Sequence, residues 1–525
     1  MRRNPRTVPA SFRGEIRTDE AARAKHADAA GILRALPAMV AVPRDADDLA
    51  TLVRWCAETA TPLVPRAAAT GMPGGNIGGG MIVDLLTPFR RILAVDAPQR
   101  RARLEPGVTL AELNAASEAA GLYFPVDPSS GARCTFGGML ANNSSGAHSV
   151  KYGATRRWVE ALELILADGT RTQVRRGTKT TDPSLRAILE RIDAALLPER
   201  EEIVRAWPKV RKNSSGYALQ EYLQSGDAVD LLVGSEGTLA LIVAAEVRLA
   251  PVPRAHGVAL LEFTDLEAAG AAVSRVLQLQ PATCEILDRT FLQLVGDAGA
   301  DAAYPLRPGL EAILLVEMDG DTPQAVADSL QRVVHEVEGV ADRVSVATDA
   351  TQRARLWEIR KAASPLIARR TDGRVSMQFI EDGVVPVDRL PDYIRVLRRV
   401  LAAHGVPAVI FGHAGDGNLH VNPLVDVAAP GWRSTIEQIL VEIAGEVAQL
   451  GGTLSGEHGD GRLRAPLLET IWGAEMVARF RTVKEAFDPR AILNPGVILP
   501  LPGQRPLDAL RHFPALAATD LPEPG

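Results

Sequence analysis

The chain has 525 residues, more than a single hydrophobic core usually organises, so at least two domains are expected. Hydrophobic residues make up 46% and charged residues 23%, as in soluble globular proteins, and the longest clean apolar stretch, 239–245, is too short to cross a bilayer. The net charge of −6, with both signs interleaved, excludes the basic surface of a nucleic-acid-binding protein.

Residues 1–35 form a polar lead-in whose basic start lacks the apolar segment of a secretory signal. A cytoplasmic protein is therefore expected, with peripheral membrane contact left open.

A helix is predicted over 46–60, where apolar residues recur at helical spacing behind Asp45 as N-cap. Thr109 and Glu112 form a capping-box pattern ahead of another helix. Apolar strands are predicted at 81–85, 162–166, 231–233 and 239–249.

The pattern of predicted elements changes around Pro251 and Pro253, where strand-like and helix-like segments begin to alternate with longer spacing. Beyond this point strands are predicted at 258–263, 312–318 and 343–346, and helices at 266–279 and 325–337. This alternation predicts an antiparallel sheet with helices on one face. We expect a first domain over 36–253, a second over 254–500, and a tail over 501–525 that is rich in proline and small residues.

Three glycine-rich loops lie in the first half. They are PRAAATGMPGGNIGGG at 65–80, FGGMLANNSSG at 136–146 and GSEGTL at 234–239. Such loops let backbone N–H groups approach an anion closely, which a pyrophosphate requires. Neither GxGxxG nor GxxxxGK[ST] occurs in its required setting, which disfavours NAD binding by a Rossmann unit and ATP chemistry.

These loops, with FPVDPSS at 124–130 and KYGATRRWVEALELILADG at 151–169, resemble in the same order the FAD-binding domain of the vanillyl-alcohol oxidase and p-cresol methylhydroxylase (PCMH) superfamily. The resemblance implies an α+β chain with a two-lobed PCMH-type domain first and an antiparallel sheet with helices second. The flavin contacts it implies are Arg66, Ala67, Ala69, Thr70, Gly71, Gly75, Asn76, Pro128, Ser129, Gly137, Gly138, Asn142, Ser145, Gly146, Glu236, Gly237, Ile242 and Asn494.

The first loop departs from the family pattern, because Ala67 and Ala69 stand where glycines are common. If these positions need a positive φ, each alanine costs roughly 1 kcal/mol. Members with a histidyl flavin carry a histidine in this loop, and none occurs here, so non-covalent FAD is predicted.

Three of the nine histidines fall in two glycine-rich motifs of the second half. His413 and His420 lie in GHAGDGNLH at 412–420, and His458 follows Glu457 in SGEHGDG at 455–461. Imidazole and carboxylate ligands suit a divalent metal, with Zn²⁺ favoured and Mn²⁺, Fe²⁺ or Co²⁺ as alternatives. Three protein ligands would leave open positions for a substrate.

The two motifs, with FDPRAILNPGVIL at 487–499, resemble the C-terminal domain of FAD-linked oxidases such as D-lactate dehydrogenase and D-2-hydroxyglutarate dehydrogenase. The resemblance implies that His413, His420 and Glu457 bind the metal and that His458 is the catalytic base. The substrate contacts it implies are Arg360 in LWEIRKAAS, Ser364 and Asn422. Ile380 stands where hydroxyglutarate enzymes carry a lysine.

The function implied is oxidation of a D-2-hydroxy acid, of the D-lactate, D-2-hydroxyglutarate or glycolate class, to the 2-oxo acid by hydride transfer to flavin N5. Three scattered cysteines without a CxxC pair offer no iron–sulfur cluster, so electrons must pass to an external acceptor. An electron-transferring flavoprotein, a cytochrome or a quinone would serve, and a homodimer is left open. The alternatives are a metal-independent flavin alcohol oxidase and a flavin-binding subunit of a larger dehydrogenase complex.

Overall fold

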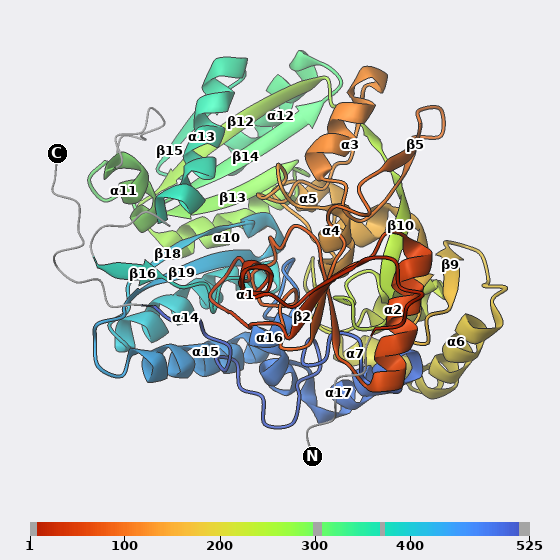
Figure 1. The fold of residues 1–525 in the computed structure, drawn as a ribbon. Coiled ribbons are helices and arrows are strands. Elements are labelled where there is room, and N and C mark those ends of the chain that lie inside the picture. Colours follow the sequence, from red (N-terminus) through yellow and green to blue (C-terminus); the bar gives the residue numbers. More distant parts are fainter. Residues whose placement is uncertain (1–7, 298–306, 368–372, 514–525) are drawn as a thin grey trace.

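The structure, a computed structural model, describes residues 8–297, 307–367 and 373–513 (Figure 1). The first half begins with a four-stranded sheet in the order β1 (Glu15–Arg17), β2 (Met39–Val42), β4 (Met81–Asp84), β3 (Leu63–Arg66). β2, β4 and β3 are parallel, and β1 is antiparallel to β2. The predicted helix is α2 (Ala46–Thr59), and the carboxylate of Asp45 caps it by accepting from the backbone N–H of Asp48.

A five-stranded antiparallel sheet completes this half, in the order β5 (Ile92–Asp96), β6 (Arg101–Leu104), β10 (Leu241–Arg248), β8 (Val159–Ile165), β9 (Arg171–Arg175). The capping box of Thr109 and Glu112 is present at the start of α3 (Leu110–Ser117). The prediction of a strand at 231–233 was wrong, because Leu231 and Leu232 end the buried helix α9 (Ala228–Leu232) and Val233 is its C-cap. A run of three apolar residues does not distinguish a buried strand from a buried helical turn.

Further short elements surround these sheets. They are α1 (Glu20–Lys25), β7 (Leu122–Tyr123), α4 (Phe136–Asn142), α5 (Ser149–Tyr152), α6 (Pro183–Leu196), α7 (Arg200–Ala206), α8 (Leu219–Ser225) and β11 (Ala250–Pro251). β7 pairs with β11, where the chain leaves the first half.

The second half is built on one large antiparallel sheet. Its strand order is β15 (Arg343–Ala347), β12 (Ala255–Phe263), β14 (Ala312–Gly320), β13 (Thr283–Asp288), β18 (Ala408–Gly412), β19 (Asn418–Asp426), β16 (Arg374–Ser376), with β17 (Gly383–Val384) also pairing with β19. The strands predicted at 258–263, 312–318 and 343–346 are therefore confirmed. The predicted helices are α10 (Leu266–Leu277) and α12 (Pro323–Glu336).

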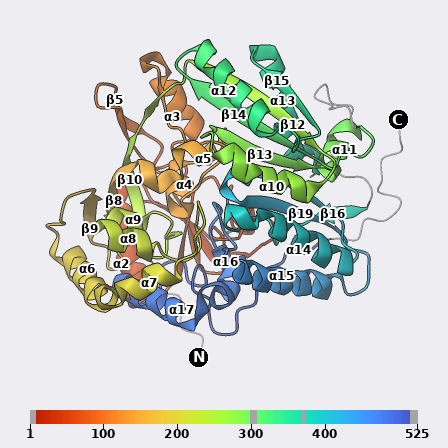
Figure 2. The same cartoon turned by 180° about the vertical axis from the view of Figure 1, so that it is seen from behind.

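The prediction that helices cover only one face of this sheet was wrong. α10, α12, α14 (Leu390–Ala403) and α15 (Trp432–Gln449) pack on one side, which Figure 2 shows from the front. α11 (Arg289–Asp297) and α13 (Ala350–Ile367) pack on the other. Both faces need cover because β12 is apolar on both, with Val258 facing α11 and α13 and Ala259 facing the other helices.

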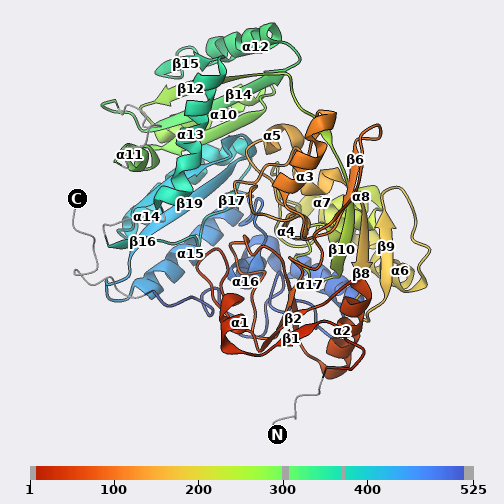
Figure 3. The same ribbon diagram turned by 45° about the horizontal axis from the view of Figure 1, so that its top comes forward.

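The end of the chain returns to the first half. After α16 (Gly461–Arg464), the long helix α17 (Leu468–Phe487) packs against α6, and Trp472 and Phe480 join the hydrophobic core built around β8 and β10. Leu493 then bridges to Leu63 of β3. The large sheet and the five-stranded sheet lie on opposite sides of the molecule (Figure 3).

Within the described ranges, no helix combines the length and the apolar character that crossing a membrane requires. Cys56, Cys134 and Cys284 are buried, and each is a free thiol.

Candidate functional site

A cavity of about 1170 Å³ is lined by residues of both halves. The first half supplies the loops at 65–76, 127–148 and 236–242, and the second half supplies side chains from α13, β18, β19 and the loop before α16. Its volume exceeds the ~300–1,000 Å³ typical of small-molecule pockets, as a dinucleotide with a second ligand requires.

Most of the side chains expected to contact flavin line this cavity. They are Arg66, Ala67, Ala69, Thr70, Gly71, Gly75, Asn76, Pro128, Ser129, Gly137, Gly138, Asn142, Ser145, Glu236, Gly237 and Ile242. Gly146 and Asn494 do not. A Cβ on Gly146 would lie 2.2 Å from the carbonyl oxygen of Asp127, so close backbone packing requires this glycine. The Asn494 amide instead donates to the carbonyl oxygens of Gly75 and Glu236 and so ties two of the lining loops together.

The two alanines of the first loop differ in backbone conformation. Ala69 has a φ of 60°, in the left-handed region that favours glycine, whereas Ala67 does not. The strain considered from the sequence therefore falls on Ala69 alone.

Three imidazoles and a carboxylate converge on one wall of the cavity. His413 follows β18 and His420 lies on β19, whose pairing places Phe411 opposite His420. Glu457 and His458 come from the loop between α15 and α16. Oε1 of Glu457 lies 3.1 Å from Nε2 of His413, 3.4 Å from Nε2 of His420 and 3.8 Å from Nε2 of His458.

The Nδ1 atom of each imidazole contacts an oxygen of Glu285 or Glu381. His413 Nδ1 lies 2.6 Å from Oε1 of Glu285, and His420 Nδ1 lies 2.9 Å from the carbonyl oxygen of Glu381. His458 Nδ1 lies 2.7 Å from Oε2 of Glu381. Such contacts fix the ring orientation and leave Nε2 of each ring facing Glu457.

The donor set fits a divalent metal ion. His413, His420 and Glu457 offer two imidazole nitrogens and one carboxylate oxygen, all within 4.8 Å of one another. A second group of Glu381, His420 and His458 meets the same distance limit. Both oxygens of Glu381 already bond to Arg464 and His458, so the first group is the better candidate.

Charge pairing dominates the electrostatics of the site. Burial would raise the pKa of Glu285, but His413 and Arg360 outweigh it and lower this pKa to about 2. Lys212 and His413 likewise hold the pKa of Glu457 well below its usual range despite burial. Burial would lower the pKa of His458, but Glu381 and Asp382 raise it to about 9.

The residues expected to bind substrate lie on the same wall. Arg360 of α13 donates from Nε to Oε2 of Glu285 at 2.7 Å, and its guanidinium lies 4.9 Å from the centre of the Phe411 ring. Asn422 is two residues from His420 on β19, so both side chains point to the same face, and both line the cavity. The side chain of Ser364 lies outside the described residues.

The sequence reasoning missed several polar residues around this wall. Glu285 joins His413 to Arg360, Glu381 holds two imidazoles, and Lys212 lies 2.8 Å from Glu457. Glu317 accepts from the Trp357 indole at 2.8 Å. One signal was available, because Glu285 and Glu317 each lie between two apolar residues within a strand, and buried acids are rare unless paired.

Comparison with known proteins adds two family matches. Residues 37–175 match a family described as FAD binding domain, and residues 252–498 match one described as FAD linked oxidases, C-terminal domain. Among solved structures, 4-ethylphenol oxidase from Gulosibacter chungangensis superposes with a TM-score of 0.67 at 15% identity, over 92% of this chain and 94% of that chain. An alkyldihydroxyacetonephosphate synthase gives a TM-score of 0.63 at 16% identity, over 91% of this chain and 83% of that chain. At such identity these two show the fold alone.

Curated relatives match almost the whole chain. The chain is 32% identical to glycolate oxidase subunit GlcD of Bacillus subtilis, over 89% of this chain and 90% of the relative. It is 30% identical to D-lactate dehydrogenase of Archaeoglobus fulgidus, over 88% and 91%. It is also 30% identical to D-2-hydroxyglutarate dehydrogenase of Pantoea ananatis, over 93% of this chain but only half of that longer protein. The chain belongs to the FAD-linked oxidases, as an oxidoreductase with an FAD-binding domain.

Proposed function

We propose that this chain oxidises a D-2-hydroxy acid to the 2-oxo acid, with FAD bound non-covalently and a divalent metal ion, Zn²⁺ favoured, held by His413, His420 and Glu457. The observation that carries the proposal is the convergence of these three groups on a cavity that the loops expected to bind flavin also line. The relatives' names support the substrate class, since they refer to glycolate, D-lactate and D-2-hydroxyglutarate.

The chain's own residues have separate tasks in this reaction. Bound FAD would supply the acceptor for the hydride from C2, and a metal ion held by His413, His420 and Glu457 would supply Lewis-acid polarisation of the 2-hydroxyl. His458 in its neutral form, with the ring proton on Nδ1 held by Glu381, accepts the hydroxyl proton at Nε2. Arg360 binds the substrate carboxylate, and Asn422 donates a hydrogen bond to the substrate.

Anaerobic flavin reduction tests the proposal. D-2-Hydroxy acids are expected to bleach the 450 nm absorbance of the FAD-loaded chain, and their L-enantiomers are not. His458→Ala is expected to keep the flavin spectrum and to lose reduction by substrate, because the variant lacks the imidazole proposed to take the hydroxyl proton. Bleaching of this variant at ~1 s⁻¹ or faster would refute the role of His458.

Metal removal separates this function from a metal-independent flavin alcohol oxidase. Chelation is expected to abolish flavin reduction, and added Zn²⁺, Mn²⁺ or Co²⁺ is expected to restore it. Full activity after the metal content has fallen to zero would favour the alcohol oxidase.

A second candidate is a flavin-binding subunit of a larger complex, favoured by a relative named as an oxidase subunit. Steady turnover of a D-2-hydroxy acid by the isolated chain with an artificial dye would argue against it. The same assay, with an electron-transferring flavoprotein, a cytochrome or a quinone in place of the dye, ranks the natural acceptors.

A further inference from the structure

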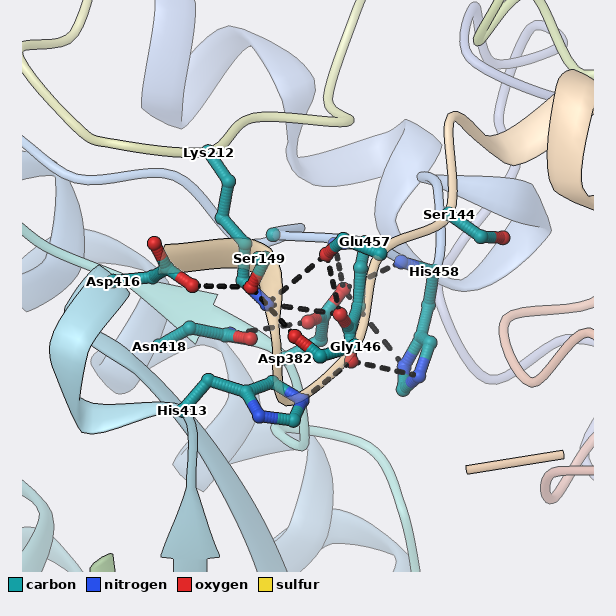
Figure 4. A network of polar contacts seen from close by, with 12 residues as sticks. Ser144, Gly146, Ser149, Lys212, Asp382, His413, Asp416, Asn418, Glu457 and His458 are labelled. Carbon is teal, nitrogen blue, oxygen red and sulfur yellow. Dashed lines mark hydrogen bonds and ion pairs between the residues drawn. The ribbon is translucent and has the colours of Figure 1, made fainter. Parts of the chain in front are cut away.

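We propose that Lys212 of the first half is a positioning residue for the metal site of the second half, an inference that rests on the metal site proposed above. Lys212 holds one oxygen of Glu457, so that the other oxygen alone is presented to the imidazoles. Figure 4 shows Lys212 and the imidazoles of His413 and His458 pointing toward Glu457 from different directions.

The two oxygens of Glu457 have different partners. Oε2 accepts from Lys212 Nζ at 2.8 Å and from the Ser145 hydroxyl at 2.6 Å. Lys212 Nζ also lies 3.2 Å from the Ser145 oxygen, which closes a triangle of three polar groups. Oε1 is the oxygen nearest to Nε2 of His413 and His420. Two donors therefore fix Oε2 of the carboxylate, and its other oxygen, Oε1, faces the imidazoles of His413 and His420.

The segment that carries Lys212 is tied to the metal-binding motif through Ser214 and Gly216. The N–H of Ser214 donates to the carbonyl oxygen of Ser455 at 2.9 Å, and its hydroxyl donates to that of Gly456 at 3.1 Å. The N–H of Gly216 donates to Oδ2 of Asp460 at 2.7 Å. The segment 212–216 thus lies alongside residues 455–460, which contain Glu457 and His458.

Lys212 and Glu457 are both buried, so their contact is not a solvent-exposed ion pair. The side chain of Lys212 is 3% exposed and that of Glu457 is 7% exposed, so neither group exchanges its partner for water. A buried lysine loses considerable hydration and side-chain entropy, which a paired carboxylate offsets only in a well-defined geometry. Ser145 also lines the cavity, so the same contact joins the metal wall to the flavin wall.

Zinc affinity of the FAD-loaded full chain tests the inference. The bound metal is measured after equilibration in chelator-buffered Zn²⁺, with the 450 nm absorbance as the measure of bound flavin. Lys212→Met is expected to weaken Zn²⁺ binding about tenfold or more, the usual effect of losing a partner of a metal ligand. Ser145→Ala removes the other donor without a change of charge and is expected to weaken binding in the same direction, by about threefold.

Lys484 provides a matched control. It is a largely buried lysine, with its side chain 12% exposed, and its Nζ lies 2.6 Å from Oδ2 of Asp488 at the end of α17. Lys484→Met is expected to lower the melting temperature without changing Zn²⁺ affinity, which separates general destabilisation from positioning.

Three other results would contradict the inference. Unchanged Zn²⁺ affinity in both Lys212→Met and Ser145→Ala overturns it while leaving the metal site intact. Tighter binding in Lys212→Met also overturns it, because the lysine would then act only by charge repulsion. A wild-type chain that binds no Zn²⁺ at this site removes the metal proposal itself, and the inference with it.

Discussion

Glu285 connects the proposed metal ligand His413 to Arg360, and replacing it by glutamine should break this connection. Glu285 has no exposed side-chain surface, and its two oxygens bond to His413 Nδ1 at 2.6 Å and Arg360 Nε at 2.7 Å. A glutamine of the same shape presents one N–H donor group. If that group faces Arg360, two donors meet. If it faces His413, Nδ1 must accept, and the ring proton moves to Nε2, the nitrogen turned toward Glu457.

Either orientation has a measurable consequence. In both orientations Arg360 loses the negative charge that pairs with it, and breaking a buried ion pair costs about 3–5 kcal/mol of unfolding free energy. The wrong imidazole tautomer should weaken metal binding by roughly 10–100-fold. Denaturant unfolding and chelator-buffered Zn²⁺ titration of Glu285→Gln measure the two effects, and KM for the hydroxy acid should rise as Arg360 loosens.

Glu317→Gln is the matched control, because Glu317 is another buried acid in the same sheet that pairs with histidines away from Glu457. It should lose stability and keep its Zn²⁺ affinity. Wild-type Zn²⁺ affinity in Glu285→Gln would refute the claim that Glu285 sets the orientation and tautomer of His413.

Three further substitutions test the loops and the core. Ala69→Gly should raise the unfolding free energy by about 0.5–1 kcal/mol, because φ is positive there, whereas Ala67→Gly should lower it by a similar amount; equal effects in thermal unfolding would contradict the backbone argument. Burial raises the pKa of Asp288 from 3.8 to about 7, so the folded chain retains a proton that the unfolded chain releases. Stability from this group therefore falls as pH rises from about 4 to 7, and Asp288→Asn should gain stability over the wild type across that window, by at most ~4 kcal/mol, in unfolding curves at pH 4 and 8. Asn494→Ala should release two loop carbonyls and weaken FAD binding by about tenfold in a fluorescence titration; unchanged affinity would deny that this amide braces the cavity.

Periodicity and turn chemistry predicted the elements with the clearest local patterns, such as α2, α10 and β14, and left others, such as β13, β18 and α17, unassigned. The helix behind Asp45 and the capping box at Thr109 follow local rules that tertiary packing did not override. The stretch at 231–233 and the second face of the large sheet could not be predicted in this way. Whether an apolar residue faces one core or another depends on which elements pack against it, and no local pattern contains that information.

The candidate site was predictable to the extent that its residues share a motif. His413, His420 and Glu457 lie in glycine-rich stretches, and the structure brings them together. Lys212 and Glu285 escaped notice because their partners are 245 and 128 residues away in the chain. In the sequence, a charged residue whose partner is remote cannot be distinguished from an ordinary surface residue. Only the fold brings the two side chains together.

The position of α17 also bears on how the protein is made. The core around β8 and β10 includes Trp472 and Phe480, so it stays incomplete until the final tenth of the chain has been synthesised. At ~5–20 residues per second, a nascent first half would wait roughly 10–40 s with this apolar surface uncovered. Folding on the ribosome should therefore depend on chaperones that shield this surface, and the two halves should not assemble as independently translated units.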